Sequence, residues 1–243
     1  MTVVRDLHTL NAHPTVVVAK FLWQEAFAAF GDVIENPRPA LHPSAVAPGN
    51  VLAANQGTAL KFAHVSRMAN LYAQAPSSRP ADAVMNMFVC AARQPRRPPA
   101  GLSHDGAEYA LSILERHPFT TQTFVPMTPD PALRYLVVVA PSRPASLADR
   151  DLPVPTSSSH AKHQGLPDLS RLRAFVAAAG QAVTYGPGTW HAPMMALGPP
   201  GSTTDFLVVQ FSNGVAIEDC QEVTLSEGHL SVRVSDGAPR PKM

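Results

Sequence analysis

Short hydrophobic runs separated by turn residues are the main pattern along this chain. The runs are rich in Val, Phe, Tyr and Leu, and Pro, Gly, Asn or Asp stand between them. They predict strands at residues 15–19, 32–35, 59–65, 84–91, 111–115, 122–125, 135–140, 182–185, 191–197, 205–211, 217–223 and 230–234. Many short strands at this spacing predict a mainly β fold, either a sandwich or a barrel.

Two segments have the period of an amphipathic helix instead. The first covers residues 23–30 and ends before Gly31. The second covers residues 167–180, where Asp168 has the chemistry of a helix start and Gly180 that of a helix end. We expect the second helix to pack across an open end or a face of the barrel.

Length and composition favour one domain over residues 1–243. A chain of 243 residues buries one sizeable core, and β-barrels of this length are commonly single domains. Its 25 prolines are about twice the usual share and must lie in loops and at sheet edges. Proline-rich connections are predicted at residues 36–49 and 94–106, and a longer loop insertion at about 141–166.

Charge and cysteine usage restrict the partners and the compartment. A formal net charge of +1 gives no broad footprint for nucleic acid or a membrane surface, and no apolar run is long enough to span a bilayer. Cys90 and Cys220 are the two cysteines, and neither has the neighbours of an activated thiolate. We expect a cytoplasmic protein; the alternative is a peroxisomal one, through the weak address in the tail at 241–243.

Two polar stretches carry the candidate chemistry. The first contains Glu115, His117 and Gln122, and the second places His191 just after a Pro-Gly turn. In an extended strand Glu115 and His117 project from the same face, and Gln122 continues that face after a break at a proline. If this face lines a barrel, the four side chains converge.

A carboxylate, two imidazoles and a carboxamide serve either proton transfer or a divalent metal. A His/Glu pair can remove one proton and return another near neutral pH. The same groups are ligands for Ni, Mn, Fe or Zn, although glutamine is a weak ligand. The alternative is a purely structural role, in which Glu115 pairs with Arg116 on an exposed edge and His117 is a core residue whose hydrogen bonds are satisfied.

The spacing of these residues is similar to the two half-motifs of cupins. A cupin's first half-motif has two ligands two residues apart and a third after a short turn, as Glu115, His117 and Gln122 have here. Its second half-motif is Pro-x-Gly-x-x-His, and residues 187–191 are similar but one residue tighter.

The chain as a whole resembles the ureidoglycolate lyases of allantoin breakdown. The resemblance rests on blocks that run in order along the chain, at residues 25–27, 30–35, 55–57, 114–127, 167–170, 172–175, 190–193 and 204–207. It implies a cupin-like β-barrel, that is, a double-stranded β-helix or a pair of half-barrels, with a few short helices. It also implies a homodimer that splits (S)-ureidoglycolate into glyoxylate and urea in purine catabolism.

Three departures from the family pattern affect what can be carried over. Many bacterial members have two adjacent histidines after the tryptophan, whereas His191 is followed here by Ala192. The basic residue after the Asn-x-Gly block is arginine in some members and Lys61 here. The insertion at 141–166 is longer than in compact bacterial forms, and it either covers the pocket or has no role there.

The chemistry of the substrate suggests the catalytic roles. Its central carbon carries a hydroxyl, a carboxylate and a ureido nitrogen, so elimination needs the hydroxyl proton removed and the nitrogen protonated. We expect His117 to be the base, with Glu115 orienting it or storing the proton and His191 the second catalytic imidazole. Lys61 and backbone N–H groups are expected to hold the carboxylate.

The remaining predicted contacts bind the rest of the substrate. Asn55 and Gln122 are expected to hydrogen-bond the urea end, and Phe124, Tyr185 and Trp190 to form an apolar wall.

A cofactor and other functions stay open at this stage. A divalent metal, Ni or Mn, would be held by His117, His191, Glu115 and Gln122; metal-free catalysis is the alternative. The competing functions are a metal-dependent cupin enzyme acting on another small hydroxy acid, a ureidoglycolate hydrolase that releases ammonia, and a receptor that binds a small ligand without turnover.

Overall fold

The fold is mainly β and cupin-like, as predicted. A computed structural model describes residues 3–7, 15–44, 51–96, 105–156, 164–226 and 228–235. Within these ranges two short α-helices occur, α1 (Gln24–Phe27) and α2 (Ala216–Asp219). Single 3₁₀ turns lie at Asn55–Gly57, Tyr72–Gln74, Leu147–Asp149 and Leu169–Arg171.

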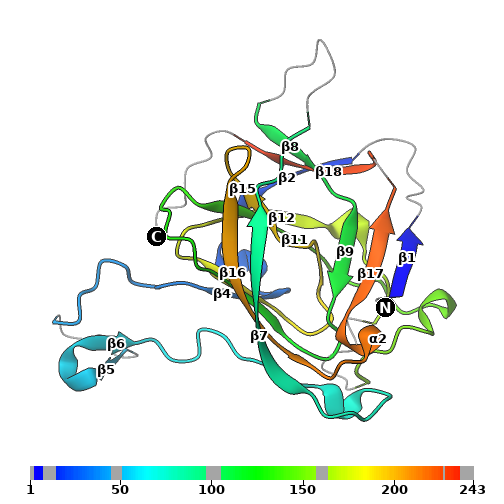
Figure 1. Ribbon diagram of the computed structural model, residues 1–243, viewed down its shortest axis with the longest axis horizontal. Coiled ribbons are helices and arrows are strands. Elements are labelled where there is room, and N and C mark those ends of the chain that lie inside the picture. The colour runs from blue at the N-terminus through cyan, green and yellow to red at the C-terminus, as the bar shows by residue number, and fades with distance from the viewer. Residues whose placement is uncertain are drawn as a thin grey trace.

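The described strands form two large sheets, a small sheet and a hairpin (Figure 1). The eight-stranded sheet has the order β1 (Val3–Leu7), β17 (Gln221–Leu225), β9 (Ile113–Arg116), β14 (Trp190–His191), β11 (Arg134–Ala140), β12 (Arg173–Ala178) and β3 (Lys20–Phe21), with β15 (Met195–Leu197) also paired to β11. The five-stranded sheet has the order β4 (Gly31–Ile34), β13 (Ala182–Tyr185), β10 (Gln122–Pro126), β16 (Thr203–Ser212) and β7 (Asp82–Ala91). The third sheet joins β2 (Thr15–Val18), β18 (Leu230–Val234) and β8 (Ala107–Ala110), and the hairpin joins β5 (Leu52–Ala54) to β6 (Ala59–Lys61).

Strand β11 lies at the centre of the core and is buried on both faces. Its side chains alternate between two hydrophobic clusters. Tyr135, Val137 and Val139 face the five-stranded sheet, whereas Leu136 and Val138 face the cluster that includes β8 and β18. The molecule is therefore layered, with the eight-stranded sheet between the other two.

The helix expected at residues 167–180 is wrong. Asp168 does cap a turn, accepting a hydrogen bond from the backbone N of Ser170 at 3.1 Å, but that turn is a single 3₁₀ turn. The chain then forms β12, between β11 and β3. Phe175 and Ala174 enter opposite core clusters, so both faces are apolar and the alternation of a strand is hidden.

Other element boundaries differ from the predictions. The helix at 23–30 is reduced to α1, the strand at 59–65 to β6, and the strand at 191–197 is divided into β14 and β15. The segment at 217–223 begins in α2 and becomes a strand only at β17. Of the remaining predicted strands, β13 and β18 have the predicted bounds and the others are present with shifts at their ends.

The described ends of the insertion at 141–166 pack into the protein. Leu152 and Leu166 belong to the core, and the carbonyl of Gly165 accepts hydrogen bonds from Arg116 at 2.9 Å and from the Trp190 indole at 3.0 Å. Residues 157–163, the central part of this segment, lie outside the described residues, as do 45–50, 97–104 and the tail at 236–243. No helix among the described residues is long and apolar enough to cross a membrane.

Candidate active site

The candidate site lies between the eight-stranded and the five-stranded sheet. Glu115 on β9 and His191 on β14 are register partners in the eight-stranded sheet. Their neighbours Leu114 and Trp190 belong to the core cluster on the other face, so strand alternation turns Glu115 and His191 towards the five-stranded sheet. That sheet contributes Gln122, from β10.

Four predicted side chains meet at this point. The Nε2 atom of His191 lies 3.1 Å from the Oε1 atom of Gln122 and 3.5 Å from a carboxylate oxygen of Glu115. The rings of His117 and His191 have centroids 5.6 Å apart. His117, Gln122 and His191 are buried, and the Glu115 side chain is 18% exposed. Glu115 is thus the member of the cluster most open to solvent.

Backbone carbonyls fix the orientation of both imidazoles. His117 Nδ1 lies 2.6 Å from the carbonyl oxygen of Asp219, and His191 Nδ1 lies 2.9 Å from that of Thr189. A carbonyl oxygen only accepts, so each Nδ1 carries the hydrogen. Both Nε2 atoms are therefore directed into the cluster.

The Nε2 atom of His191 is faced by side-chain oxygen atoms. The side-chain amide nitrogen of Gln122 donates to Gln210 at 2.8 Å, so the oxygen of Gln122, Oε1, is the atom that faces His191 Nε2. The Glu115 carboxylate faces the same Nε2 atom of His191. Both of these oxygens are acceptors. The arrangement is satisfied by a second proton on His191 or by a metal ion.

The pKa values of the neighbouring groups move in different directions. Burial lowers the pKa of His117, and the nearby charge of His191 lowers it further, against the opposing effect of Glu115. Burial would raise the pKa of Glu115, but a hydrogen bond to His191 and electrostatic interactions with His191 and His117 outweigh it and lower that pKa. The site therefore combines a neutral imidazole with an ionised carboxylate at neutral pH.

The predicted aromatic wall is only partly assembled. Tyr185 stacks on the His191 ring with centroids 4.0 Å apart and an interplanar angle of 10°, and Phe124 lies 6.1 Å from Tyr185. Trp190 lies on the other face of β14, where the Arg116 guanidinium sits 4.5 Å from its ring. Because neighbouring strand residues alternate, Trp190 cannot line the same space as His191.

Asn55 and Lys61 are not brought to this cluster. Both side chains are exposed, and they belong to the β5–β6 hairpin, which Figure 1 shows apart from the two large sheets. Asn55 and Gln56 have positive φ angles of 49° and 54° in the turn of the hairpin. Within one chain, the carboxylate-binding role expected for Lys61 has no support from its position.

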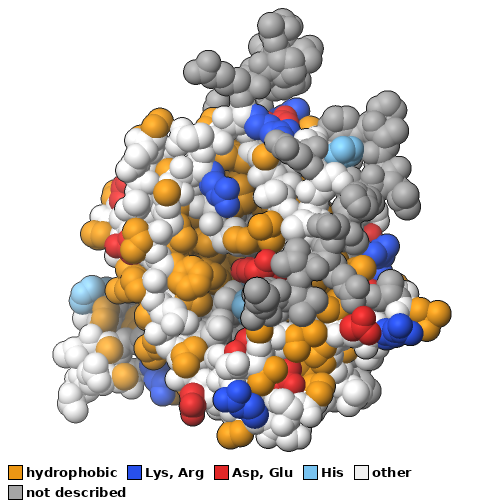
Figure 2. All heavy atoms as spheres, turned by 45° about the vertical axis from the view of Figure 1, so that its right-hand side comes forward, with side chains coloured by type: hydrophobic (Ala, Val, Ile, Leu, Met, Phe, Trp, Pro, Cys, Tyr) orange, Lys and Arg blue, Asp and Glu red, His pale blue; other side chains and the backbone are white. Residues whose placement is uncertain are grey.

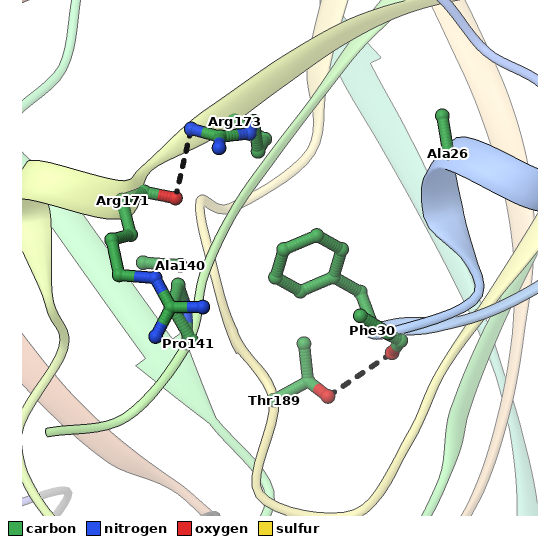
Figure 3. A pocket seen from close by; sticks show the side chains of 8 residues that line it. Ala26, Phe30, Ala140, Pro141, Arg171, Arg173 and Thr189 are labelled. Carbon is green, nitrogen blue, oxygen red and sulfur yellow. Dashed lines mark hydrogen bonds between the residues drawn. The ribbon is translucent and has the colours of Figure 1, made fainter.

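A separate cavity lies behind the turn that leads to His191. It has a volume of about 240 Å³ and is lined by Ala26, Ala29, Phe30, Ala140, Pro141, Arg171, Arg173 and Thr189. Figure 3 shows the Thr189 hydroxyl directed at the carbonyl of Phe30, to which it donates at 3.0 Å. The backbone N of Gly186 donates to the same carbonyl at 2.9 Å. The corner at Phe30 therefore holds the turn whose Thr189 carbonyl orients His191.

The cluster also fits a divalent metal. One ligand atom each from Glu115, His117 and His191 lies within 4.8 Å of the others. His117 Nε2 is buried and has no hydrogen-bond partner among the described residues. Metal-binding histidines usually donate their other ring N–H to a carbonyl or carboxylate, as both histidines do here. The residues present are thus compatible with Ni or Mn.

Comparisons with known proteins identify the family. A sequence model of the ureidoglycolate lyase family matches residues 14–233. The chain belongs to the ureidoglycolate lyase family. A ureidoglycolate lyase of Schizosaccharomyces pombe is 35% identical over 221 residues, which cover 90% of this chain and 97% of that protein. One from Saccharomyces cerevisiae is 35% identical over 222 residues, covering 89% and 97%, and one from Burkholderia mallei is 33% identical over 188 residues, covering 77% and 78%.

Two residues near the site of this member of the ureidoglycolate lyase family were not predicted from the sequence. Asp219 supplies the carbonyl that binds His117, and Glu222 on β17 is the register partner of Glu115. Both follow from the pairing of β9 with β17, which are separated by about a hundred residues of chain. Glu218 and Asp219 form an acidic pair in the sequence, but nothing local in the sequence places that pair beside His117.

Proposed function

We propose that this protein is a ureidoglycolate lyase that splits (S)-ureidoglycolate into glyoxylate and urea. The observation that carries the proposal is the pair of buried imidazoles, each held at Nδ1 by a carbonyl, with both Nε2 atoms around the Glu115 carboxylate. Family membership supports the same substrate. The reaction is an elimination without oxidation or reduction.

His117 is the proposed base. Its Nε2 has a free lone pair and its pKa is lowered by burial, so the ring is neutral and able to accept the proton of the substrate hydroxyl. As that proton leaves, the oxygen forms the C=O bond of glyoxylate and the C–N bond breaks. The electron pair of the C–N bond goes to the ureido nitrogen.

His191 is the proposed proton donor to the ureido nitrogen. Its Nε2 faces the carboxylate of Glu115 and the carbonyl oxygen of Gln122, which favour a proton on that atom. After the reaction His117 holds the proton of the substrate hydroxyl and His191 has given its Nε2 proton to urea, so the two imidazoles have exchanged protonation states. Glu115 lies within 4.8 Å of both rings and is placed to return the proton.

The other proposed contacts differ in the support they receive. Gln122 lies beside His191, so it is placed to hydrogen-bond the urea end, and Phe124 and Tyr185 supply the apolar wall. Asn55 and Lys61 would take part only if the β5–β6 hairpin of another copy reached the site.

A divalent metal, Ni or Mn, is the alternative proposal for the same cluster, because it would be held through the Nε2 atoms that the proton transfer uses. His117, His191 and Glu115 would hold it, with Gln122 as a weak fourth ligand. Bound there, such an ion supplies Lewis-acid polarisation of a substrate oxygen.

Product analysis tests the proposed function. Purified protein, with and without prior chelation, is incubated with (S)-ureidoglycolate, and urea, glyoxylate and ammonia are measured. Equal amounts of urea and glyoxylate without ammonia are expected. Loss of activity on chelation and its rescue by Ni or Mn would establish the metal.

The runner-up functions correspond to other results of this assay. Release of ammonia would identify a ureidoglycolate hydrolase. Absence of turnover would indicate a cupin enzyme acting on another small hydroxy acid, or a binding protein, and would overturn the proposal.

A homodimer is the proposed assembly, formed through the outer face of β7 and β16. Met85, Met87 and Val89 alternate along β7 and are 73%, 57% and 65% exposed. The register partners of Met85 and Met87 on β16 are Val209 and Leu207, which continue the apolar face, and the partner of Val89 is Asp205, which ends it. β7 is also the last strand of its sheet. An apolar patch on an edge strand is typical of a surface that is covered by another chain, and a second copy is the partner we propose.

Two further statements stay proposals. We propose a single cupin-like domain over residues 1–243, with 141–166 as an insertion, which agrees with a family match over 14–233. We also propose a cytoplasmic location, with the peroxisome as the alternative.

A further inference from the structure

His117 depends on one backbone carbonyl for its tautomer. Among the described residues, the acceptor at its Nδ1 is the carbonyl oxygen of Asp219, at 2.6 Å. With the hydrogen on Nδ1, the lone pair is on Nε2, inside the cluster. The opposite tautomer would place an N–H at Nε2, next to the charge of Glu115, and the ring could not act as a base there.

The Asp219 carbonyl is held in place by its own side chain. The carboxylate accepts four hydrogen bonds: from the Tyr72 hydroxyl at 2.6 Å, the Ser212 hydroxyl at 2.7 Å, and the backbone N atoms of Asn213 at 3.0 Å and Gly214 at 2.9 Å. α2 has only four residues, so helix hydrogen bonds alone give it little rigidity. The carboxylate ties the end of α2 to β16 and to Tyr72.

Tyr72 connects this anchor to the segment that carries His117. It is 1% exposed, and its ring lies 5.8 Å from that of Phe119, two residues after His117. The backbone N of Leu71 donates to the carbonyl of Phe119 at 2.7 Å. Burial, and then the hydrogen bond to Asp219, raise the pKa of Tyr72, so the hydroxyl keeps its hydrogen and remains a donor. One packed unit thus holds both the imidazole and the carbonyl that orients it.

We propose that Asp219 and Tyr72 are positioning residues that hold His117 in the Nδ1–H tautomer, with the Nε2 lone pair directed at the substrate. The proposal deepens the proposed lyase function and rests on it for the kinetic result. Neither residue is proposed to touch the substrate. They act through the carbonyl of Asp219.

The test combines kinetics with a direct measurement of the tautomer. Tyr72→Phe and Asp219→Ala are compared with wild type for kcat and KM on (S)-ureidoglycolate, and long-range ¹H–¹⁵N correlation spectra report which ring nitrogen of His117 carries the hydrogen. We expect kcat to fall about 10-fold in Tyr72→Phe and up to about 100-fold in Asp219→Ala, as for other residues that orient a functional imidazole. KM should change little, and the Nε2–H tautomer should appear in both variants.

A matched control and a rescue separate positioning from general stability. Tyr135→Phe removes a hydroxyl that donates to the carbonyl of Gln181 at 2.8 Å, in a different part of the core. It should leave both kcat and the His117 tautomer unchanged. Asp219→Asn keeps one acceptor oxygen and should recover part of the activity lost in Asp219→Ala.

Several results would overturn the proposal. An unchanged tautomer in Tyr72→Phe, or an unchanged kcat despite a changed tautomer, would each contradict it. If Asp219→Ala does not fold, Tyr72→Phe still decides, since it removes a single hydroxyl. If the wild type does not act on ureidoglycolate, the proposed function fails, whereas the spectra still show whether Tyr72 and Asp219 control the tautomer.

Discussion

Each imidazole in the site is defined by the hydrogen bond at its outer nitrogen. Thr189 and Asp219 supply backbone carbonyls that accept from Nδ1, so the positions of the hydrogens on His191 and His117 follow from the fold. This leaves one neutral base, one imidazole that faces two acceptors, and one carboxylate between them. The two histidines differ at Nε2: that atom of His191 faces two acceptors, whereas that of His117 has no hydrogen-bond partner among the described residues.

The lowered pKa of His117 predicts how stability changes with pH. Burial, then the charge of His191, lower its pKa in the folded protein, whereas in the unfolded chain it is near 6.5. The unfolded state therefore binds more protons as pH falls through about 6.5, and the free energy of unfolding decreases by about 1.4 kcal/mol for each unit of pKa difference. His117→Gln should lose less stability than wild type between pH 7.5 and 5.5, measured by urea unfolding.

That pH window separates His117 from its neighbour. Glu115 also has a lowered pKa, but its reference value is 4.5, so its contribution is lost only at more acidic pH. Parallel stability curves for wild type and His117→Gln over the window would contradict the prediction.

Strand alternation in the sequence predicts that Glu115, His117 and Gln122 share a face. The pairing of β9 with β14 then places His191 beside Glu115. The anchor at Asp219 could not be predicted in this way, because β17 pairs with β9 only after the long-range topology is set. Lys61 is the opposite case, a residue that was predicted for the site and is not there. Its side chain belongs to the β5–β6 hairpin, which lies away from the cluster.

At the scale of elements, the turn from β13 to β14 depends on its contact with β4. Tyr185 is the register partner of Gly31, and the neighbouring Phe30 carbonyl binds Gly186 and Thr189. Gly31 has a φ of +151°, and a Cβ atom there would lie 1.8 Å from the carbonyl oxygen of Thr184. The chain can approach β13 this closely only with glycine.

Gly31→Ala should therefore be strongly destabilising. Gly180→Ala is the control, since Gly180 has a φ of +82° but nothing within 4 Å of an added Cβ. The control should cost about 1–2 kcal/mol from backbone strain alone. Gly31→Ala should cost about 3 kcal/mol or more, measured by urea unfolding, because a clash adds to the strain. An equal decrease in the free energy of unfolding in the two variants would contradict the prediction, because it would show that the clash with Thr184 is removed without loss of stability.

The error at β12 has a physical cause at this same scale. A half-buried strand shows alternation, but β12 is covered on both faces and reads as a continuous apolar run. Its flanking Asp168 and Gly180 serve turns at a strand's two ends as well as they would serve a helix. β9 and β10 were found, β9 with its bounds shifted by two residues at its start and one at its end, because polar side chains such as Glu115 and Thr123 interrupt their apolar runs.

At the scale of the whole molecule, the outer face of β7 and β16 is the feature that a single chain leaves uncovered. Figure 2 shows hydrophobic side chains spread over much of the surface around a recessed group of acidic and histidine side chains. The strongly exposed residues of β7 include Met85, Met87 and Val89. A homodimer through this face would remove them from water.

Met87→Asp should weaken the dimer. A charge at the centre of an apolar interface must be desolvated without a partner, so the variant should be monomeric at concentrations where wild type is dimeric, as measured by analytical ultracentrifugation. Leu147→Asp is the control, because Leu147 is 87% exposed but lies in a 3₁₀ turn away from β7. A wild type that is monomeric at all concentrations, or a dimer unaffected by Met87→Asp, would contradict the assembly proposed.

The value of kcat/KM for His117→Gln on (S)-ureidoglycolate is the most direct test of the central claim, that His117 is the base of the elimination. His42→Gln serves as the control, because His42 bonds only to exposed Ser44 among the described residues. Glutamine keeps a hydrogen-bonding group of similar size but cannot take up the proton, so kcat/KM should fall by about 10²–10⁴ while His42→Gln stays at the wild-type value. Near-normal turnover by a folded His117→Gln protein would contradict the account.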